Sequence, residues 1–480
     1  MRKHAGHFVL AGLLLASTAC VQGPDYQRPA VEVPDDFRFQ DATASVEADT
    51  RVWWDAFDDP TLDALVDEAL ANNRDLRIAS ARVDEAAAIV SGARAQGLPQ
   101  VGYAVQGSRQ RTSDPGSEPF VGNTRSSLGG ALVASWEIDL WGRIARETEA
   151  ARANLLATDE ARRGVVLTLI SSVIVGYLNL LDLDERLRIS EETVDGRRQY
   201  VELFEVRLRG GVISDFEMAQ VLAEYETTLA TLPELRRQIA LQEDALAVLL
   251  GRNPGPIERP STLDTIAMPA VPGGLPSELL TRRPDILQAE QVLVASNASI
   301  GAVRAQYFPR ISLTSLLGLA STALGDLFSS SARTWSFAGE IAGPIYTGGG
   351  LEAATAQALA RREQALAAYE RTIQNAFRDT EDALVSLQTA GETEEIQRRR
   401  VVALANGVRL ARERYENGYS STLDMLDTER GLLSAQLSLT GARADRYRAL
   451  VSLYRALGGD WVAEPELDQG AAPADTGELP

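Results

Sequence analysis

One glycine-centred turn occurs twice in this chain, 207 positions apart. Residues 207–218 read RLRGGVISDFEM and residues 414–425 read RYENGYSSTLDM. ARAQGLPQV at residues 93–101 is likewise similar to VRAQYFPRI at residues 303–311. The period is far longer than the roughly 20 to 50 residues of solenoid repeats. The sequence therefore predicts a tandem duplication, in which each copy of about 200 residues is one structural unit.

Each copy contains a long stretch without proline. None occurs between Pro119 and Pro233, or between Pro344 and Pro465, and both stretches are rich in residues that favour helix. In the second stretch a seven-residue spacing interrupted at Thr380 joins Leu359, Leu366, Ile373 and Leu387, a pattern typical of a coiled-coil seam. A helix of about 60 residues would be roughly 90 Å long. We therefore expect long helical hairpins, each reversing at one glycine turn.

Each copy also contains two segments in which apolar and polar residues alternate, within residues 100–106, 128–140, 311–319 and 335–345. Strands of about ten residues with one apolar face are typical of transmembrane barrels. A soluble sheet with one wet face gives the same pattern, so this alternative stays open. Four strands cannot close a membrane barrel, because the smallest has about eight and open edges cannot be exposed to lipid. Two copies of the chain would give eight strands around a filled interior, whereas three would give twelve, so a pore favours a trimer.

The first 20 residues, MRKHAGHFVLAGLLLASTAC, indicate a secretory signal peptide at residues 1–19. Cys20 is the only cysteine, and its setting after Ser17 to Ala19 resembles a bacterial lipoprotein cleavage box, in which the cysteine becomes the lipidated first residue. Ordinary cleavage near an incidental cysteine is the alternative. Because Val21 rather than aspartate follows, the resemblance implies delivery to the outer membrane.

Most enzyme classes lose an essential group in the mature chain. Lys3, His4 and His7 are its only lysine and histidines, and all three leave with the signal peptide. Catalysis by Ser-His-Asp or Cys-His, histidine metal sites and a P-loop lysine are thereby excluded. A hydrolase that uses only carboxylates has no local constellation to support it, so we expect no enzyme, no cofactor and no metal. The net charge of -20 argues against nucleic acid as a partner.

The chain is expected to divide into six parts. These are a signal peptide (1–19), a lipid-anchored extended segment (20–50), a first repeat (51–251; strand pair about 98–141, hairpin tip near 211), a proline-rich linker (252–277), a second repeat (278–459; strand pair about 307–346, hairpin tip near 418) and a disordered tail (460–480).

From about residue 21 to 460 the chain resembles the outer membrane factors of the TolC/OprM type. The resemblance rests on GPDYQRP after the cysteine, WWDAFDDPTLDALVDEAL at 53–70, RRPDILQAE at 282–290 and RYENGYSSTLDMLDTE at 414–429. It implies a mixed α+β membrane protein, a homotrimer whose twelve-stranded transmembrane β-barrel is continuous with a long periplasmic α-helical coiled-coil barrel. The implied function is a passive outer membrane exit duct of a tripartite efflux pump, fed by a periplasmic adaptor and an inner-membrane pump of the RND type. The alternative is a structural or adhesive coiled-coil lipoprotein, which would conduct no ions.

The resemblance also gives roles to residues near the two turns. It implies a pore gate of Asp424, Asp427 and Glu217, and a gate latch at Tyr415. It further implies adaptor-contacting hairpin tips at five small residues: Gly210, Gly211, Ser214, Gly418 and Ser421. For each glycine a plain helix-to-helix turn is the alternative reading, and for each acid a solvated helix face.

Overall fold

Helices form most of the chain in the computed structural model, which describes residues 21–39, 53–111, 124–269, 271 and 276–459. The expected signal peptide, Cys20 and the tail from 460 lie outside the described residues. The first copy contains η2 (Trp53–Phe57), α2 (Pro60–Asn72), α3 (Arg74–Ala95), β1 (Gln100–Arg111), β2 (Thr124–Ile138), α4 (Arg143–Arg209), α5 (Asp215–Leu229) and α6 (Thr231–Leu249). The second contains η3 (Pro276–Glu278), α7 (Leu279–Arg282), α8 (Pro284–Ala305), β3 (Arg310–Ser321), η4 (Leu324–Asp326), η5 (Ser330–Ala332), β4 (Arg333–Ala342), α9 (Gly350–Glu416) and α10 (Thr422–Ala456).

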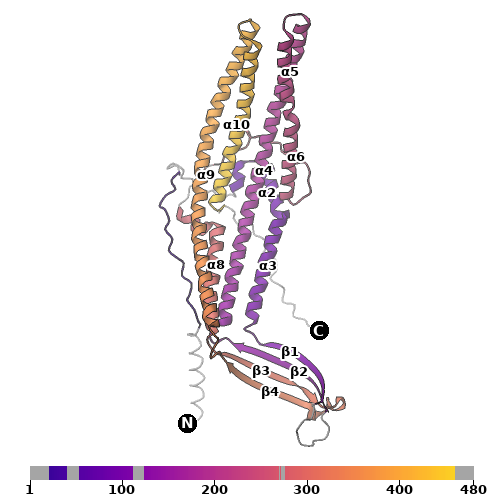
Figure 1. Ribbon diagram of the computed structural model, residues 1–480, viewed down its shortest axis with the longest axis vertical. Helices are drawn as coiled ribbons and strands as arrows, with labels where there is room; N and C mark the ends of the chain where they lie inside the picture. Colours follow the sequence, from indigo (N-terminus) through magenta and orange to yellow (C-terminus); the bar gives the residue numbers. More distant parts are fainter. Residues whose placement is uncertain (1–20, 40–52, 112–123, 270, 272–275, 460–480) are drawn as a thin grey trace. The chain divides into compact units, whose positions relative to one another are not determined.

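The chain forms two compact units, and the long helices α4 and α9 each contribute residues to both. The first, here called the sheet unit, comprises residues 1–31, 81–159 and 288–370. Its four strands pair antiparallel in the order β1-β2-β3-β4, as Figure 1 shows. The central pairing, β2 with β3, joins a strand of one copy to a strand of the other. The duplication therefore produces one sheet and not two.

The sheet has one apolar face. Side chains that lie directly opposite on paired strands share a face, and alternate residues along a strand return to it. Tyr103 lies opposite Leu132, Leu132 opposite Leu317, and Leu317 opposite Trp335, so these four side chains form one row across the strands. Tyr103, Leu317 and Trp335 are 84%, 65% and 69% exposed. A sheet face that is this apolar and this exposed must be covered by something other than the chain itself.

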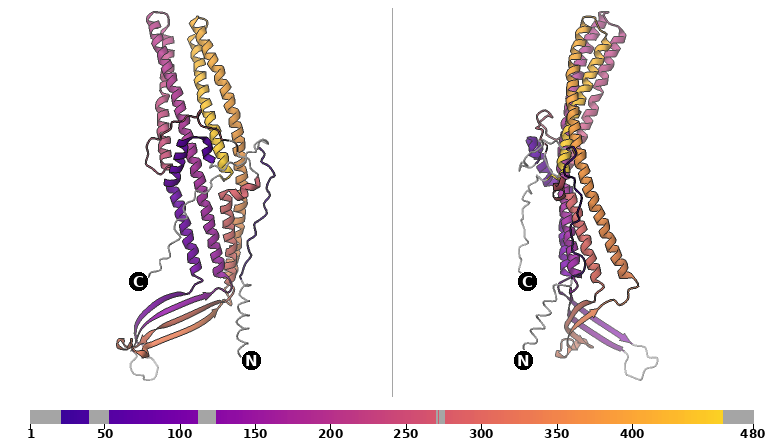
Figure 2. Two further views of the ribbon diagram at one scale, coloured as in Figure 1. Left: turned by 180° about the vertical axis from the view of Figure 1, so that it is seen from behind. Right: turned by 90° about the vertical axis from the view of Figure 1, so that its left-hand side faces the viewer.

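The second unit, here called the hairpin unit, comprises residues 32–80, 160–287 and 371–480. Helix α5 folds back on α4, and α10 folds back on α9; in Figures 1 and 2 both turns lie at the same end of this unit. Near the turns the two hairpins share an apolar cluster that includes Phe204 of α4, Val221 of α5 and Met425 of α10. The two copies therefore pack against each other in this unit too.

The main core of the hairpin unit surrounds the apolar middle of α4. This stretch, VVLTLISSVIVGYLNLL at residues 165–181, packs against α2, α6 and α10, and Tyr177 within it is fully buried. Among the described residues α4 is the one helix long and apolar enough to cross a membrane, but most of its apolar window is buried inside the protein. The buried window is typical of a core helix.

Asp59 connects this core to the start of α2. Its carboxylate accepts hydrogen bonds from the backbone N–H of Thr61 and Leu62, as an N-cap residue does, and from the hydroxyl of Tyr177 at 2.9 Å. Asp59 is only 2% exposed, and these bonds satisfy its buried carboxylate.

The buried side of α9 differs from the expected seam at two residues. Thr380, which we expected as an interruption, is fully buried, and its hydroxyl donates to the carbonyl of Ala376 at 3.0 Å. Leu359, expected within the seam, is 44% exposed. A threonine is tolerated at a buried helix position because its hydroxyl can bond one turn back along its own helix.

Candidate functional site

Both hairpin tips are built from the same backbone motif. At the first tip Gly211 has φ +69°, its N–H donates to the carbonyl of Leu208, and the N–H of Val212 donates to that of Arg207, each at 2.9 Å. This is a Schellman motif, which ends a helix with a residue in the left-handed conformation. Because an added Cβ would meet nothing within 4 Å, it is the backbone conformation alone that requires glycine here.

The second tip repeats this geometry 207 positions later. Gly418 has φ +76°, and its N–H donates to the carbonyl of Tyr415 at 3.0 Å. The N–H of Tyr419 donates to the carbonyl of Arg414 at 2.8 Å. The neighbouring tip glycine of the first copy, Gly210, is exposed and has an ordinary φ. The spacing of 207 residues between the two turns therefore corresponds to one glycine in the left-handed conformation in each copy.

A capping box starts the returning helix at each tip. Ser214 accepts from the N–H of Glu217 at 3.2 Å, and Glu217 accepts from the N–H of Ser214 at 2.9 Å. Ser421 and Asp424 make the same reciprocal pair at 3.2 and 3.0 Å. These bonds satisfy N–H groups that a helix start leaves without partners. Two of the residues that resemblance assigns to the gate thus also hold the turn.

Hydrogen bonding keeps both capping acids ionised. The backbone and side-chain bonds from Ser214 lower the pKa of Glu217, and the side-chain and backbone bonds from Ser421 lower the pKa of Asp424. Each carboxylate is therefore charged throughout the neutral range. Loss of charge, and with it loss of the cap, is expected only as the pH falls through these lowered values.

The two capping acids differ in what their second oxygen contacts. Oε1 of Glu217 accepts from the hydroxyl of Thr422, on the other hairpin, at 3.2 Å. Asp424 is exposed, and within the described part of the chain its hydrogen bonds go only to its own turn and helix. Asp427, one turn further along α10, is also exposed, and its nearest cation is Arg430 at 4.0 Å. Of the three acids, Asp427 thus has the weakest side-chain interactions within the described part of the chain.

Tyr415 joins the second hairpin to the first. Its ring stacks on that of Phe204, with centroids 6.0 Å apart and planes 10° apart. Its hydroxyl accepts a hydrogen bond from Arg207 at 3.2 Å, and the guanidinium of Arg207 also lies 5.7 Å from the ring centroid. Among the described residues, the buried hydroxyl of Ser420, in the same tip, has no hydrogen-bond partner. At Tyr415 the contact between the hairpins is therefore aromatic and cationic.

A buried charged network, which sequence reasoning missed, lies further from the tips. Arg197 of α4 is 5% exposed and donates to Glu224 of α5 at 3.1 Å and to Thr228. Glu224 also pairs with Arg430 of α10 at 3.1 Å, so one carboxylate connects both hairpins. Burial lowers the pKa of Arg197, and its Nε and Nη2 have no hydrogen-bond partner among the residues that the structure describes. No local pattern indicates this network, because Arg197 stands among charged residues like any solvated arginine.

The sheet unit offers a different kind of site, its two free edges. Among the described strands, β1 pairs only with β2 and β4 only with β3, so each has one side without a strand partner there. Every residue of β1 is exposed, and so is nearly every residue of β4. Unpaired backbone groups along an edge are a template for another strand. Both edges therefore suit a second copy of the same sheet.

The segment that follows Cys20 is held against the sheet unit. Glu290 of α8, only 6% exposed, accepts from Nε of Arg28 at 2.7 Å and from the hydroxyl of Tyr26 at 3.1 Å. Burial, with the charge of Glu290, raises the pKa of Tyr26, so its hydroxyl stays protonated. One buried carboxylate thus binds two residues of the GPDYQRP stretch.

The same segment is fixed close to the end of β2. The N–H of Gln22 donates to the carbonyl of Trp141 at 3.2 Å, and Val21 packs against Gly142, whose φ is +75°. Cys20 itself is outside the described residues, but its neighbour is placed at the junction of strand and helix.

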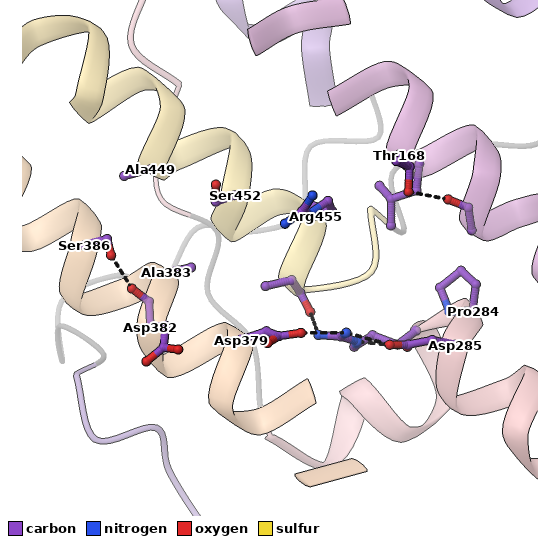
Figure 3. A pocket seen from close by; sticks show the side chains of 14 residues that line it. Thr168, Pro284, Asp285, Asp379, Asp382, Ala383, Ser386, Ala449, Ser452 and Arg455 are labelled. Atoms are coloured by element: carbon purple, nitrogen blue, oxygen red, sulfur yellow. Dashed lines mark hydrogen bonds and ion pairs between the residues drawn. The ribbon is translucent and has the colours of Figure 1, made fainter. Parts of the chain in front are cut away.

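The hairpin unit also contains a cavity of about 500 Å³ between α4, α8, α9 and α10. Figure 3 shows Asp285 and Asp379 on either side of a guanidinium, that of Arg283. Arg283 is 8% exposed, bonds both carboxylates and donates to the carbonyl of Ala456 at 2.9 Å. Its donors are thus used to connect the start of α8 to the end of α10. Among the described residues, no group of three or more His, Cys, Asp or Glu is arranged to hold a metal ion.

Comparison with known proteins gives consistent results over nearly the whole chain. The family model described as outer membrane efflux protein matches twice, at residues 65–252 and 275–459, one match in each copy. The chain is 36% identical to the toluene efflux pump outer membrane protein TtgC of Pseudomonas putida, over 94% of this chain and 96% of that protein. It is 36% identical to the cation efflux system protein CusC of Escherichia coli, over 93% and 97%.

Solved structures are similar as well. The crystal structure of the open state of the Neisseria gonorrhoeae MtrE outer membrane channel matches with a TM-score of 0.82 and 32% identity, over 92% of this chain and 99% of that one. The outer membrane channel OprN matches with a TM-score of 0.85 and 30% identity, over 92% and 100%. The family resemblance inferred from short stretches of sequence is thereby confirmed.

Proposed function

Because the chain belongs to the outer membrane efflux protein family, we propose that it is the outer membrane exit duct of a tripartite efflux pump. It conducts small molecules passively and has no nucleotide site of its own. The observation that carries the proposal is the open sheet: four strands, two free edges and an apolar, exposed face. Such a sheet is stable in lipid only when its edges are paired.

Three copies complete the pore. When β1 of each copy pairs with β4 of the next, the sheets close into a barrel of twelve strands, wide enough for a channel. Two copies would give eight strands, whose interior side chains fill the lumen. The helices of the three copies then continue the barrel as a periplasmic coiled-coil tunnel.

The partners are an adaptor in the periplasm and an inner-membrane pump of the RND type. The adaptor docks on the hairpin tips, where Gly210, Gly211, Ser214, Gly418 and Ser421 are all exposed. Because both tips share one backbone geometry, a trimer presents six similar docking points. The names of the relatives refer to different cargoes, toluene and cations, which supports a duct that selects little by itself.

The pore is gated at the second tip. Asp427 and Asp424 are exposed acids one turn apart on α10, and three copies would bring six such charges around one axis. Like charges that converge repel one another, so a closed gate needs contacts that offset this repulsion. Tyr415, held by Phe204 and Arg207 of the first hairpin, is the proposed latch. Glu217 contributes less to the ring, since its carboxylate is bound on both oxygens.

Cys20 is the proposed lipid anchor, and cleavage after residue 19 would make it the first residue. The clamp of Arg28 and Tyr26 on Glu290 supports this, because it fixes the chain only a few residues beyond the anchor. The anchor would then lie near the membrane end of the helices rather than on a free tether.

Edge pairing can be tested with cysteines. In a Cys20→Ser background, one cysteine replaces Tyr103 on β1 and one replaces Phe337 on β4, with other β4 positions scanned for register. We expect a covalent trimer on non-reducing gels and discrete ion channels in planar bilayers. The matched control places the second cysteine on β3, which is already paired on both sides. A protein that stays monomeric in lipid and conducts no ions would instead support the structural lipoprotein.

The gate is tested by single-channel conductance. The double variant Asp424→Asn, Asp427→Asn removes the charges, while the amide oxygen of asparagine at position 424 can still accept the hydrogen bond from the N–H of Ser421. We expect higher conductance and weaker cation preference. Asp215→Asn, an exposed tip acid outside the proposed ring, is the control and should conduct like the natural protein. Equal conductance in all three proteins would remove the gate assignment.

A further inference from the structure

Three arginines extend the apolar face of the sheet at the end where its strands are joined by loops. Along β1 the apolar face contains Val101, Tyr103 and Val105, and the same face continues in steps of two residues to Arg109 and Arg111. On β4, Arg333 lies opposite Leu319 on this face. All three arginines are exposed. The face therefore changes from apolar to cationic within a few residues.

No carboxylate on the described strands neutralises this cluster. Glu137 and Glu340 both lie opposite Ser312, which places them on the other face and at the other end of the sheet. Within the part of the chain that the structure describes, none of the three arginines forms an ion pair or side-chain hydrogen bond. The nearest described acid in the loops is Asp326, in the connection between β3 and β4. In a chain of net charge -20, an uncompensated basic cluster is a local feature that needs its own explanation.

The chemistry of the face selects a ligand with both an apolar and an anionic part. Apolar side chains on a membrane-facing sheet contact acyl chains, and cationic side chains just beyond them reach the headgroup level. Guanidinium groups bind phosphate oxygens through two parallel hydrogen bonds and are the preferred partners of phosphate esters. A ligand that satisfies both parts is a phosphorylated lipid.

We propose that Arg109, Arg111 and Arg333 bind the phosphate groups of acylated lipids in the outer leaflet of the membrane. This inference rests on the proposed function, which places the face in lipid and its loop end outward. In the proposed trimer β1 of one copy lies beside β4 of the next, and both strands have their arginines at the loop end. Each site would then combine two arginines of one copy with Arg333 of its neighbour, so a bound lipid would also bridge the subunits.

The test compares two arginine faces of the full-length protein. The triple variant Arg109→Gln, Arg111→Gln, Arg333→Gln removes the cluster. Arg125→Gln is the matched control, because Arg125 is exposed at the same end but lies opposite Gln110, on the other face. Bis-phosphorylated lipid A, its dephosphorylated form and inorganic phosphate are titrated separately against purified protein in detergent, with bound lipid counted by native mass spectrometry.

We expect lipid A to bind the natural protein and Arg125→Gln alike, and about tenfold more weakly to the triple variant, as the loss of several charge-assisted bonds implies. Dephosphorylated lipid should bind all proteins equally weakly. Equal lipid A affinity in natural and triple-variant protein, or an equal loss in Arg125→Gln, would overturn the proposal. Binding of inorganic phosphate as tight as that of lipid A would show that the lipid is not the ligand.

Two further measurements separate this proposal from folding and from the proposed function. The triple variant Arg109→Lys, Arg111→Lys, Arg333→Lys keeps the charge but loses the paired hydrogen bonds, so its affinity should lie between those of the natural protein and the glutamine variant. A loss equal to that of the glutamine variant would contradict the charge argument. Channel conductance is measured for every variant. Channels of normal conductance with lost lipid binding support the site alone, whereas absence of channels in the natural protein would refute the duct and not the lipid chemistry.

Discussion

The two copies of the repeat share their turns and differ in the helices that leave them. Both tips combine a Schellman glycine with a capping box. After the second tip α10 continues unbroken for 35 residues, whereas the matching part of the first copy is divided into α5 and α6 at Ala230. Pro233 stands in the first turn of α6, and its counterpart in α10 is Thr440, whose N–H is available to the helix. Proline at this position in the first copy thus explains why α5 and α6 are separate helices whereas α10 is continuous.

A second difference between the copies lies in the hydrogen bond that holds the C-terminal end of the last helix, α6 in the first copy and α10 in the second. Asn73 donates to the carbonyl of Leu249 at the end of α6, and Arg283 donates to that of Ala456 at the end of α10. These are equivalent places, but Asn73 acts alone whereas Arg283 also holds Asp285 and Asp379. The two copies therefore share the backbone geometry of the turns and helix ends, and they differ in the side chains around it.

The largest effect is expected at the tips that the copies share. Gly418→Pro cannot form the turn, because proline fixes φ near −65° and the turn needs +76°. We expect export to be lost while the protein still reaches the membrane, and Gly211→Pro to behave alike. Alanine at either site should cost only about 1–2 kcal/mol. Drug susceptibility and surface levels are measured together; normal resistance with Gly418→Pro would break the equivalence of the tips.

Exchanging the helix breaker should have effects of very different size in the two copies. Thr440→Pro removes a helical hydrogen bond at a buried position, and we expect a loss of about 3 kcal/mol or more in unfolding free energy. Pro233→Ala should change it by less than about 1 kcal/mol, because the break lies in a first turn where proline is tolerated. Denaturation in detergent gives both values. Similar losses in both variants would show that proline does not explain the break.

Breaking the hydrogen bonds at the end of α10 should lower the free energy of unfolding about twice as much as breaking those at the end of α6. Arg283→Met leaves the carbonyl of Ala456 and two carboxylates without their partner, and we expect a loss of about 3 kcal/mol. Asn73→Ala removes a neutral bond and the cap on Leu76, worth about 1.5 kcal/mol. Unfolding midpoints of the two variants test this order. The reverse order would show that the charges around Arg283 contribute little.

The smallest effect concerns α2, an acidic helix that α7 does not match in the second copy. Burial, with the charges of Asp55 and Asp59, raises the pKa of Asp63 to about 6. The pKa of Asp63 is thus higher in the folded protein than in the unfolded chain, where it is near 4. The stability that this difference contributes is fully present below about pH 4 and is lost as the pH rises through 6. Asp63→Asn should therefore stabilise the protein by about 1 kcal/mol at pH 7.5. Melting temperatures at pH 7.5 and 4.5 test this, and a gain that is equal at both pH values would contradict it.

Much of the fold could be inferred from local patterns. The alternation from Leu128 to Leu140 predicted a strand where β2 runs, and the stretches without proline correspond to α4 and α9. The apolar spacing along α9 was a weaker guide, since Thr380 is buried and Leu359 is exposed. Burial depends on what packs against a helix, and periodicity along one helix does not contain that information. The trimer, the gate and the lipid anchor remain predictions.

The sequence by itself determined the duplication, the two left-handed glycine positions and the kinds of element between them, because backbone conformation depends on residues close in the chain. Only the tertiary structure decided which side chains meet. It placed Tyr415 on Arg207, buried Arg197 against Glu224, and brought Arg109, Arg111 and Arg333 to one face of a sheet made by both copies. Arg207 and Tyr415 are 208 positions apart and Arg109 and Arg333 are further apart still, so packing and strand register fix these placements, and no local pattern records them.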